Sequence, residues 1–328
     1  MVKGFWEKLK RPFFVLAPMA DVTDAAFRRV IAKYGKPDVI WTEFVSADGL
    51  CHPKGREKLL IDLKYTEAER PIVAQLFTAH PDKMFEAAKL VQELGFDGLD
   101  INMGCPDRTI EKQGAGAALI KTPSLAQEVI RAAQAGAPKL PISVKTRIGY
   151  NRDELDPPAG GWISNLLETG LSALTIHART RKEMSKVPAR WERVAAAVEL
   201  RNKLAPETLI IGNGDVRDMT HARELAKKTG ADGIMLGRAI FGNPFLFSDQ
   251  IPNTETKLKV LVEHTKLFEE LLVRPPAGGK SFAIMKKHYK AYVRGWTGAE
   301  ELRAELMETT NAGEVENVVD KHLSSMLD

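Results

Sequence analysis

Short apolar runs recur along the first three quarters of the chain, and a stretch with helical spacing follows each of them. The runs are continuous rather than alternating, which is typical of parallel strands buried on both faces. They begin near Phe13, Val39, Ile72, Gly98, Ile142, Ala173, Thr208 and Gly233. Eight such strands alternating with helices predict a closed (β/α)8 TIM barrel, an α/β fold. The main alternative, an open doubly wound sheet, usually has fewer strands, and no G-x-G-x-x-G motif follows the first run.

The expected helices between the runs carry start signals. Thr23 is a candidate cap for the first helix, in which apolar side chains recur at helical spacing from Phe27 to Tyr34. Pro81 and the pair Thr122-Pro123 are typical of the first turn of two later helices.

The pattern changes after Phe247. Residues 248–254 (SDQIPNT) have the composition of a linker, and residues 256–328 lack strand-like runs and show helical spacing. We therefore expect two domains, a catalytic barrel over residues 1–247 and a small C-terminal helical bundle over residues 255–328.

The composition is that of an ordinary globular protein, since 44% of the 328 residues are apolar and 27% are charged. No apolar run reaches the length of about 18 residues that a membrane span needs, and the N-terminus lacks the apolar region of a signal peptide. Cys51 and Cys105 are the only cysteines, which excludes a disulfide framework and a cysteine-based zinc site. We expect a cytoplasmic protein with no membrane contact and no metal.

The net charge of +4 is a mild excess, and its distribution is more informative than its size. Residues 280–294 contain no acid and carry Lys280, Lys286, Lys287, Lys290 and Arg294, with aromatic residues between them. Such a run is usually a solvated helix face, but the interleaved aromatics favour contact with a phosphate backbone equally well. The loop after the sixth strand is also basic.

Polar residues gather where the predicted strands end, which is the face of a barrel that carries chemistry. These strand ends are Ala17-Pro18-Met19-Ala20, Gln75, Asn102 to Pro106, Lys145-Thr146-Arg147, His177-Ala178-Arg179, Gly212-Asn213-Gly214-Asp215 and Gly237-Arg238. The last two belong to the seventh and eighth units, whose loops often bind phosphate in barrels. Glycine lets backbone N–H groups approach an anion, so we expect a phosphate site there rather than plain turns.

Three further side chains at this face have more than one interpretation. Lys145 could form a Schiff base, could stabilise the anion of a reduced flavin, or could be an ordinary salt-bridged lysine. His177 could bind a phosphate or a base edge, or be structural. Cys105 lies in a Gly-Cys-Pro turn, where a thiol could act as a general acid, although most cysteines are incidental.

Together these motifs resemble the tRNA-dihydrouridine synthase family. Residues 16–28 (LAPMADVTDAAFR) are similar to its opening signature, and residues 100–106 (DINMGCP) to its active-site signature, the most specific match. Residues 144–147 (VKTR), 177–180 (HART), 212–215 (GNGD) and 237–244 (GRAIFGNP) follow in family order. The sequence departs from the family at Ala178, where glycine is frequent, and residues 149–162 match no signature.

The resemblance implies an FMN-dependent oxidoreductase that reduces the 5,6 double bond of specific uridines in tRNA, with NADPH or NADH as reductant. Hydride would reach C6 of the uracil from the flavin, and Cys105 would protonate C5. The resemblance also implies a monomer without a protein partner. Residues implied to hold the cofactor are Pro18, Met19, Ala20, Gln75, Lys145, His177, Asn213, Gly214, Asp215, Gly237 and Arg238. Residues implied to contact the tRNA are Asn102, Arg147, Arg179, Lys286, Lys287 and Arg294.

Three other functions fit parts of this pattern. An FMN-dependent ene-reductase or dihydroorotate-type dehydrogenase would share the barrel and the phosphate site, but the basic tail and the Gly-Cys-Pro turn argue against it. A Schiff-base aldolase would use Lys145 without a flavin. An RNA-binding barrel without catalysis would have no need of Lys145 and Cys105 together.

Overall fold

The computed structural model describes residues 2–155, 161–273 and 279–325. Its strands form one parallel sheet in the order β1-β8-β7-β6-β5-β4-β3-β2. A bridge between Val15 and Val39 brings β1 back to the start of β2, so the sheet closes on itself. This confirms the predicted barrel and excludes the open sheet. The strands are β1 (Phe13–Leu16), β2 (Ile40–Ser46), β3 (Ile72–Phe77), β4 (Gly98–Met103), β5 (Ile142–Arg147), β6 (Ala173–His177), β7 (Leu209–Asn213) and β8 (Gly233–Leu236).

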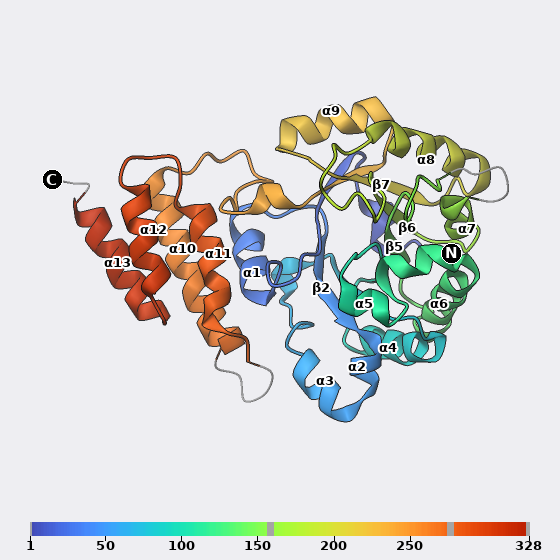
Figure 1. Cartoon of the computed structure of the whole chain (residues 1–328), viewed down its shortest axis with the longest axis horizontal. Helices are drawn as coiled ribbons and strands as arrows, with labels where there is room; N and C mark the ends of the chain where they lie inside the picture. Colours follow the sequence, from blue (N-terminus) through green and yellow to red (C-terminus); the bar gives the residue numbers. More distant parts are fainter. Residues whose placement is uncertain (1, 156–160, 274–278, 326–328) are drawn as a thin grey trace.

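Helices connect successive strands and cover the outside of the sheet (Figure 1). They are α1 (Ala25–Tyr34), α2 (Ala47–Cys51), α3 (Pro53–Leu59), α4 (Pro81–Glu93), α5 (Arg108–Lys112), α6 (Pro123–Gly136), α7 (Trp162–Leu167), α8 (Trp191–Leu204) and α9 (Met219–Thr229). Short 3-10 turns are η1 (Gly4–Lys8), η2 (Glu67–Glu69), η3 (Gly116–Lys121) and η4 (Arg238–Ile240). None of the described helices combines the length and the apolar character that crossing a membrane requires.

The helix start signals are correct for two helices and wrong for one. Pro81 and Pro123 occupy the first turns of α4 and α6, as predicted. The first helix is capped by Asp24, whose carboxylate accepts the Phe27 N–H at 2.9 Å. Thr23 cannot serve as the cap because its hydroxyl accepts the N–H of Met19, at 2.9 Å, in the preceding loop.

An aromatic cluster fills the amino-terminal end of the barrel. Trp6 of η1 packs against Phe13 and Trp41, with ring centroids 5.6 and 6.1 Å apart, respectively. Phe13 and Trp41 lie at the beginnings of β1 and β2, so Trp6 closes this end. The opposite end, where the strands finish, is left for a ligand.

The C-terminal part of the chain is helical, as predicted. It comprises α10 (Thr254–Phe268), the π-helical η5 (Glu269–Val273), the 3-10 turn η6 (Phe282–Ile284), α11 (Met285–Tyr292), α12 (Ala299–Glu308) and α13 (Ala312–Ser325). These helices stand side by side next to α1, on one side of the barrel (Figure 1). Phe27 of α1 stacks on His264 of α10 at 4.8 Å, which joins the helical tail (residues 254–325) to the barrel. The division into domains ending at 247 and beginning at 255 stays a prediction.

Candidate active site

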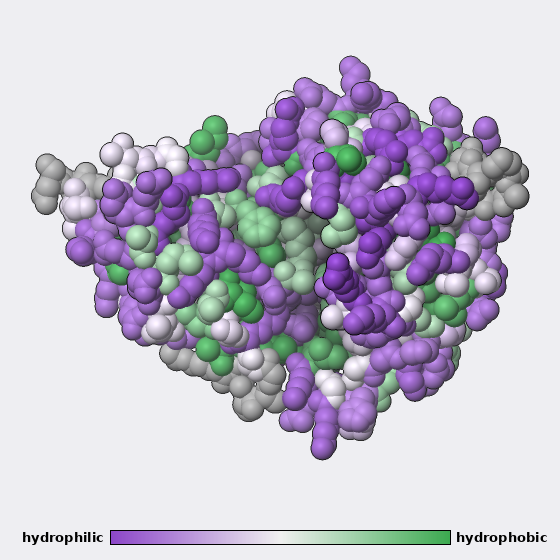
Figure 2. Space-filling view, viewed as in Figure 1, coloured by the Kyte–Doolittle hydropathy of each residue, from purple (hydrophilic) through white to green (hydrophobic). Residues whose placement is uncertain are grey.

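A cavity of about 710 Å³ opens where the barrel strands end. It is lined by Ala17, Pro18, Met19, Lys145, His177, Arg179, Ser185, Asn213, Gly214, Asp215, Val216, Arg217, Met235, Gly237, Arg238 and Ala239. Residues from the first, fifth, sixth, seventh and eighth units therefore meet in one place, as the strand-end pattern predicted. In Figure 2 the visible face is hollowed between the helical tail and the barrel, with apolar residues on the floor of the hollow.

Two arginines share one carboxylate at the wall of the cavity. Asp215 accepts hydrogen bonds from Arg238 at 2.7 Å and from the Ala189 N–H at 2.9 Å, and it also pairs with Arg179. Burial works against the charge of Asp215, but Arg179 and the Ala189 N–H outweigh it, so the pKa of Asp215 is lowered. One carboxylate balances two guanidinium groups, which leaves this wall with a net positive charge.

His177 ends β6 beside this wall and is neutral. Burial lowers its pKa well below the ordinary value, and the charges of Arg147, Lys145 and Arg179 add to the effect. Its Nε2 lies 3.1 Å from Nη1 of Arg179. Because a guanidinium can only donate, Nε2 must accept, and the proton is on Nδ1. His177 therefore offers an N–H donor through Nδ1.

Lys145 lines the cavity from the end of β5. Within the described part of the chain, its ammonium makes no hydrogen bond or ion pair. Burial lowers the pKa of Lys145 to about 8, and the charge of Arg147 contributes, while Asp100 opposes the shift. A cationic side chain that lines a cavity and makes no direct ion pair is suited to an electron-rich ligand.

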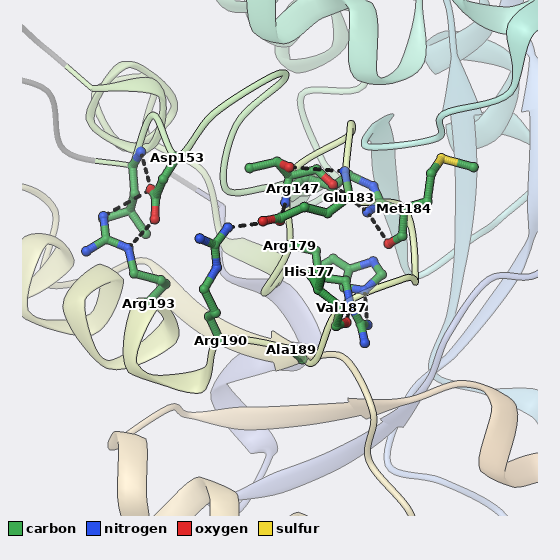
Figure 3. A network of polar contacts seen from close by, with 12 residues as sticks. Arg147, Asp153, His177, Arg179, Glu183, Met184, Val187, Ala189, Arg190 and Arg193 are labelled. Carbon is green, nitrogen blue, oxygen red and sulfur yellow. Dashed lines mark hydrogen bonds and ion pairs between the residues drawn. The ribbon is translucent and has the colours of Figure 1, made fainter.

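Arg147 is also buried, but it does not line the cavity. Its Nε donates to the Gly104 carbonyl at 2.8 Å, and Nη1 donates to the carbonyls of Thr180 and Met184 at 3.1 and 3.0 Å, respectively. Figure 3 shows this arginine beneath the loop that follows β6. Arg147 therefore ties two loops together, a role that sequence reasoning missed.

Further ion pairs hold the loop after β6 against its neighbours. Arg190 pairs with Glu183 at 2.9 Å within the loop, and Arg193 of α8 pairs with Asp153 at 2.7 Å (Figure 3). Residues 149 and 150 contribute their carbonyls, which accept the N–H groups of Arg181 and Lys182 at 2.8 and 2.9 Å, respectively. The first part of segment 149–162, which matches no family signature, thus packs on the β6 loop. Residues 156–160 of this segment lie outside the described residues.

A chain of hydrogen bonds crosses the barrel interior toward Cys105. Gln75 donates to Asp100 at 2.6 Å and accepts from the Asn102 amide at 3.1 Å. The Asn102 oxygen in turn accepts the N–H of Cys105 at 2.9 Å. Gln75 and Asn102 are buried and do not line the cavity. Through these hydrogen bonds they fix the backbone conformation of the loop after β4.

Cys105 itself is half-buried in that loop. Burial raises the pKa of its thiol, so the group is protonated at neutral pH. The Ala117 N–H donates to the Cys105 carbonyl at 2.9 Å. A side chain on Gly116, whose φ is +62°, would place its Cβ 2.8 Å from the same carbonyl oxygen, so the loop depends on glycine there.

Comparisons with known proteins show the family of this chain. The sequence model of the Dihydrouridine synthase (Dus) family matches residues 15–327. The chain belongs to the dihydrouridine synthase family. A probable tRNA-dihydrouridine synthase of Staphylococcus aureus (strain COL) is 42% identical over 99% of this chain and 98% of its own length. A probable tRNA-dihydrouridine synthase 2 of Bacillus subtilis (strain 168) is 42% identical over 100% and 99%.

A distant likeness to a solved structure supports the fold. Histamine dehydrogenase from Rhizobium sp. 4-9 superposes with a TM-score of 0.52 at 12% sequence identity, over 77% of this chain and 48% of that one. At this identity the match concerns the barrel architecture alone.

In this dihydrouridine synthase, some residues implied by the resemblance lie away from the cavity. Ala20 is exposed and does not line it. Lys286 and Lys287 are on α11 and Arg294 follows that helix, so all three belong to the helical tail. Ala178 is buried and is not among the described residues with positive φ, so alanine is tolerated in place of the glycine frequent in the family.

The basic run 280–294 is not one continuous surface. Lys280 is largely buried and pairs with Glu43 at 2.7 Å and Asp62 at 2.9 Å, whereas Lys290 and Arg294 are exposed. The two interpretations of this run, a solvated helix face and contact with a phosphate backbone, both fail for Lys280. They fail because the acids that neutralise Lys280 come from distant parts of the chain.

Sequence reasoning also gave no role to Asp100. Its carboxylate accepts from Ser143 at 2.5 Å as well as from Gln75, and burial raises its pKa to about 6. A charged residue in the middle of an apolar strand is the signal that could have identified it.

Proposed function

We propose that this dihydrouridine synthase reduces the 5,6 double bond of specific uridines in tRNA to dihydrouridine, with FMN as cofactor and NADPH or NADH as reductant. We further propose that it acts in the cytoplasm as a monomer. The observation that carries the proposal is the positively charged cavity at the strand ends of a Dus-family barrel. The half-buried Cys105 does not itself line this cavity, but its thiol is close enough to the lining residue Lys145 for the two groups to interact electrostatically.

The residues of the cavity fit FMN. A flavin phosphate needs cationic and N–H donors, and Arg179, Arg238 and the glycine loops after β7 and β8 supply them. A Cβ on Gly237 would make ordinary van der Waals contacts, 3.6 Å from the side chains of Ala17 and Met19, so no other group lies closer than this to the backbone there. Lys145 makes no hydrogen bond or ion pair with the described residues, although Asp100 is close enough to act on its pKa, and the electron-rich edge of a flavin would give its ammonium a direct partner.

The residues that line the cavity then have proposed roles in holding FMN. Arg179, Arg238, Gly214 and Gly237 would hold the phosphate, and Asp215 would position the two arginines rather than touch an anion itself. Residues with a proposed place along the ribityl chain and the ring are His177, Asn213, Lys145, Pro18 and Met19.

FMN, when bound and reduced by NADPH or NADH, would supply the hydride that C6 of the uracil receives. Negative charge then develops at C5, and Cys105 would deliver its proton there. A thiol whose pKa is raised by burial holds that proton at neutral pH until the base becomes basic enough to take it. Gln75 and Asn102 would contribute by keeping the Cys105 backbone in place.

The RNA would be gripped by basic residues outside the cavity. Lys286, Lys287 and Arg294 of the helical tail, together with the β6 loop, would contact phosphates around a flipped uridine. Contacts of this kind make binding weaken steeply with salt, so tRNA affinity is expected to fall as ionic strength rises.

The decisive test is to incubate the purified protein with NADPH and tRNA that lacks dihydrouridine, digest the RNA, and look by mass spectrometry for a uridine heavier by two hydrogens. A uridine with this added mass supports the reaction and the substrate class, and the RNA fragment that contains it identifies the position of the uridine. No gain, with flavin bound and NADPH oxidised on several tRNAs, refutes the tRNA substrate and favours a small-molecule ene-reductase. A protein that purifies without flavin and does not bind FMN refutes the cofactor.

A further inference from the structure

Within the helical tail, the side chain of Lys280 contacts the barrel. The ammonium lies 2.7 Å from Oε2 of Glu43, 2.9 Å from Oδ1 of Asp62 and 4.0 Å from Oδ1 of Asp21. The Lys280 side chain is only 14% exposed. Its backbone N–H also donates to the Leu272 carbonyl at 2.6 Å, which holds it to the end of the π-helical turn η5. Lys280 therefore joins the tail to three acids of the barrel.

Glu43 transmits this contact to the loop between β1 and α1. It lies on β2 with its side chain 6% exposed, and its second oxygen accepts the N–H of Asp21. Asp21 has a φ of +52°, in the left-handed region that residues other than glycine avoid. Such a conformation persists only when its surroundings enforce it. Here the Glu43 carboxylate holds the N–H of Asp21.

The loop held in this way lines the cavity. Pro18 and Met19 stand immediately before Asp21 and contribute to the cavity wall. The Met19 N–H is bound by Thr23 at 2.9 Å, so hydrogen bonds secure the loop on both sides of Ala20. A change at Asp21 would therefore alter the wall against which a flavin is expected to lie.

We propose that Lys280 is a positioning residue for the cofactor cavity, which through Glu43 holds the β1–α1 loop in shape and ties the helical tail to the site. The proposal rests on the proposed function, since it takes FMN as the ligand. Without the ammonium, Glu43 would be a buried carboxylate beside Asp62, and such a group takes up a proton rather than stay charged. A neutral carboxyl is the weaker acceptor for the Asp21 N–H, so the left-handed turn would lose its support.

The test compares FMN binding by variants of the full chain. Lys280→Met is expected to bind FMN about tenfold more weakly, the size of one charge-assisted hydrogen bond, and to shift the visible absorption bands of bound flavin. Lys280→Arg should restore both properties because it keeps the charge. Lys290→Met, at an exposed position on α11, is the matched control and should behave as the wild type.

A second variant separates positioning from general loss of structure. Asp21→Gly in the Lys280→Met background should recover most of the FMN affinity, because glycine adopts a φ of +52° without support. If Lys280→Met does not fold, Glu43→Gln is measured in the same way. Its amide is neutral and has one oxygen in place of two, so it cannot accept from both Lys280 and the Asp21 N–H as the carboxylate does.

The outcomes distinguish the two proposals. Wild-type FMN affinity and spectrum in Lys280→Met, or in Glu43→Gln, overturn the positioning role and leave the proposed function standing. Failure of Asp21→Gly to restore affinity also overturns it. A wild-type protein that binds no FMN refutes the proposed function, and the role of Lys280 falls with it.

Discussion

Replacing His288 should change how the stability of the protein depends on pH. His288 lies fully buried on α11, and neither ring nitrogen has a hydrogen-bond partner within the described residues. It packs edge-on against Phe27 at 5.0 Å and against His264 at 4.7 Å. Burial lowers the pKa of His288 to about 3, and the charge of Lys287 adds to the shift. His288 is therefore neutral in the folded protein at every pH well above 3.

The size of the effect follows from proton linkage. Between about pH 6.5 and pH 3 the unfolded chain protonates this histidine and the folded chain does not, so the free energy of unfolding falls as pH falls. The full slope is about 1.4 kcal/mol per pH unit. From pH 7 to pH 5 this histidine alone should cost the folded state about 2 kcal/mol. His288→Leu, of similar volume and without a titrating group, should lose that dependence.

The assay is urea unfolding followed by tryptophan fluorescence, at pH 7 and pH 5. The quantity to compare is the difference in the free energy of unfolding between wild type and His288→Leu. Buried carboxyls titrate in the same pH range and stabilise the folded state on acidification, and taking the difference removes their contribution. Asp24 and Asp100, with pKa values raised by burial to about 7 and 6, respectively, are examples. That difference should move by about 2 kcal/mol in favour of the variant on acidification. His52→Leu, at an exposed position, should run parallel to wild type. An equal difference at both pH values would show that His288 is not held neutral by the fold.

Three further variants test the site and the fold. Cys105→Ala should keep FMN and lose about 10²–10⁴-fold in turnover on tRNA, because a general acid contributes that much. Gly214→Ala should weaken FMN binding in a fluorescence titration, since φ is +129° and the new Cβ would lie 2.8 Å from that of Ala189. Arg28→Met should lower the free energy of urea unfolding by about 3–5 kcal/mol, because it leaves the fully buried Glu69 without its partner at 2.8 Å.

Each of these variants has a matched control in the same chain. Cys51→Ala should have the same turnover on tRNA as the wild type. Wild-type turnover in Cys105→Ala would disprove the assignment of Cys105 as the general acid. Gly170→Ala also has a positive φ, of +72°, but no atom within 4 Å of the new Cβ, so it should leave FMN binding unchanged. Arg29→Met removes a neighbouring arginine that is only partly buried, and a loss of stability as large as that of the Arg28 variant would contradict the ion-pair explanation.

The sequence by itself determined the barrel and the place of the site. Continuous apolar runs predict strands buried on both faces, and alternation with helices leaves the parallel barrel as the arrangement that buries all of them. Polar residues at the ends of those strands must then share one face, which is why Lys145, His177, Asn213 and Arg238 could be assigned to a common cavity before any coordinates. These inferences need only local pattern and the rule that parallel strands end on the same side.

Only the tertiary structure decided which polar groups are free and which are already bound. Arg147 and Lys145 both stand at the end of β5, yet the first is occupied by carbonyls of two loops and the second has no partner among the described residues. Lys280 belongs to a basic run by sequence, but its partner Glu43 lies 237 residues away along the chain. Hydrogen bonds and ion pairs of this kind depend on distance in space, and the spacing of residues along a chain carries no record of that distance.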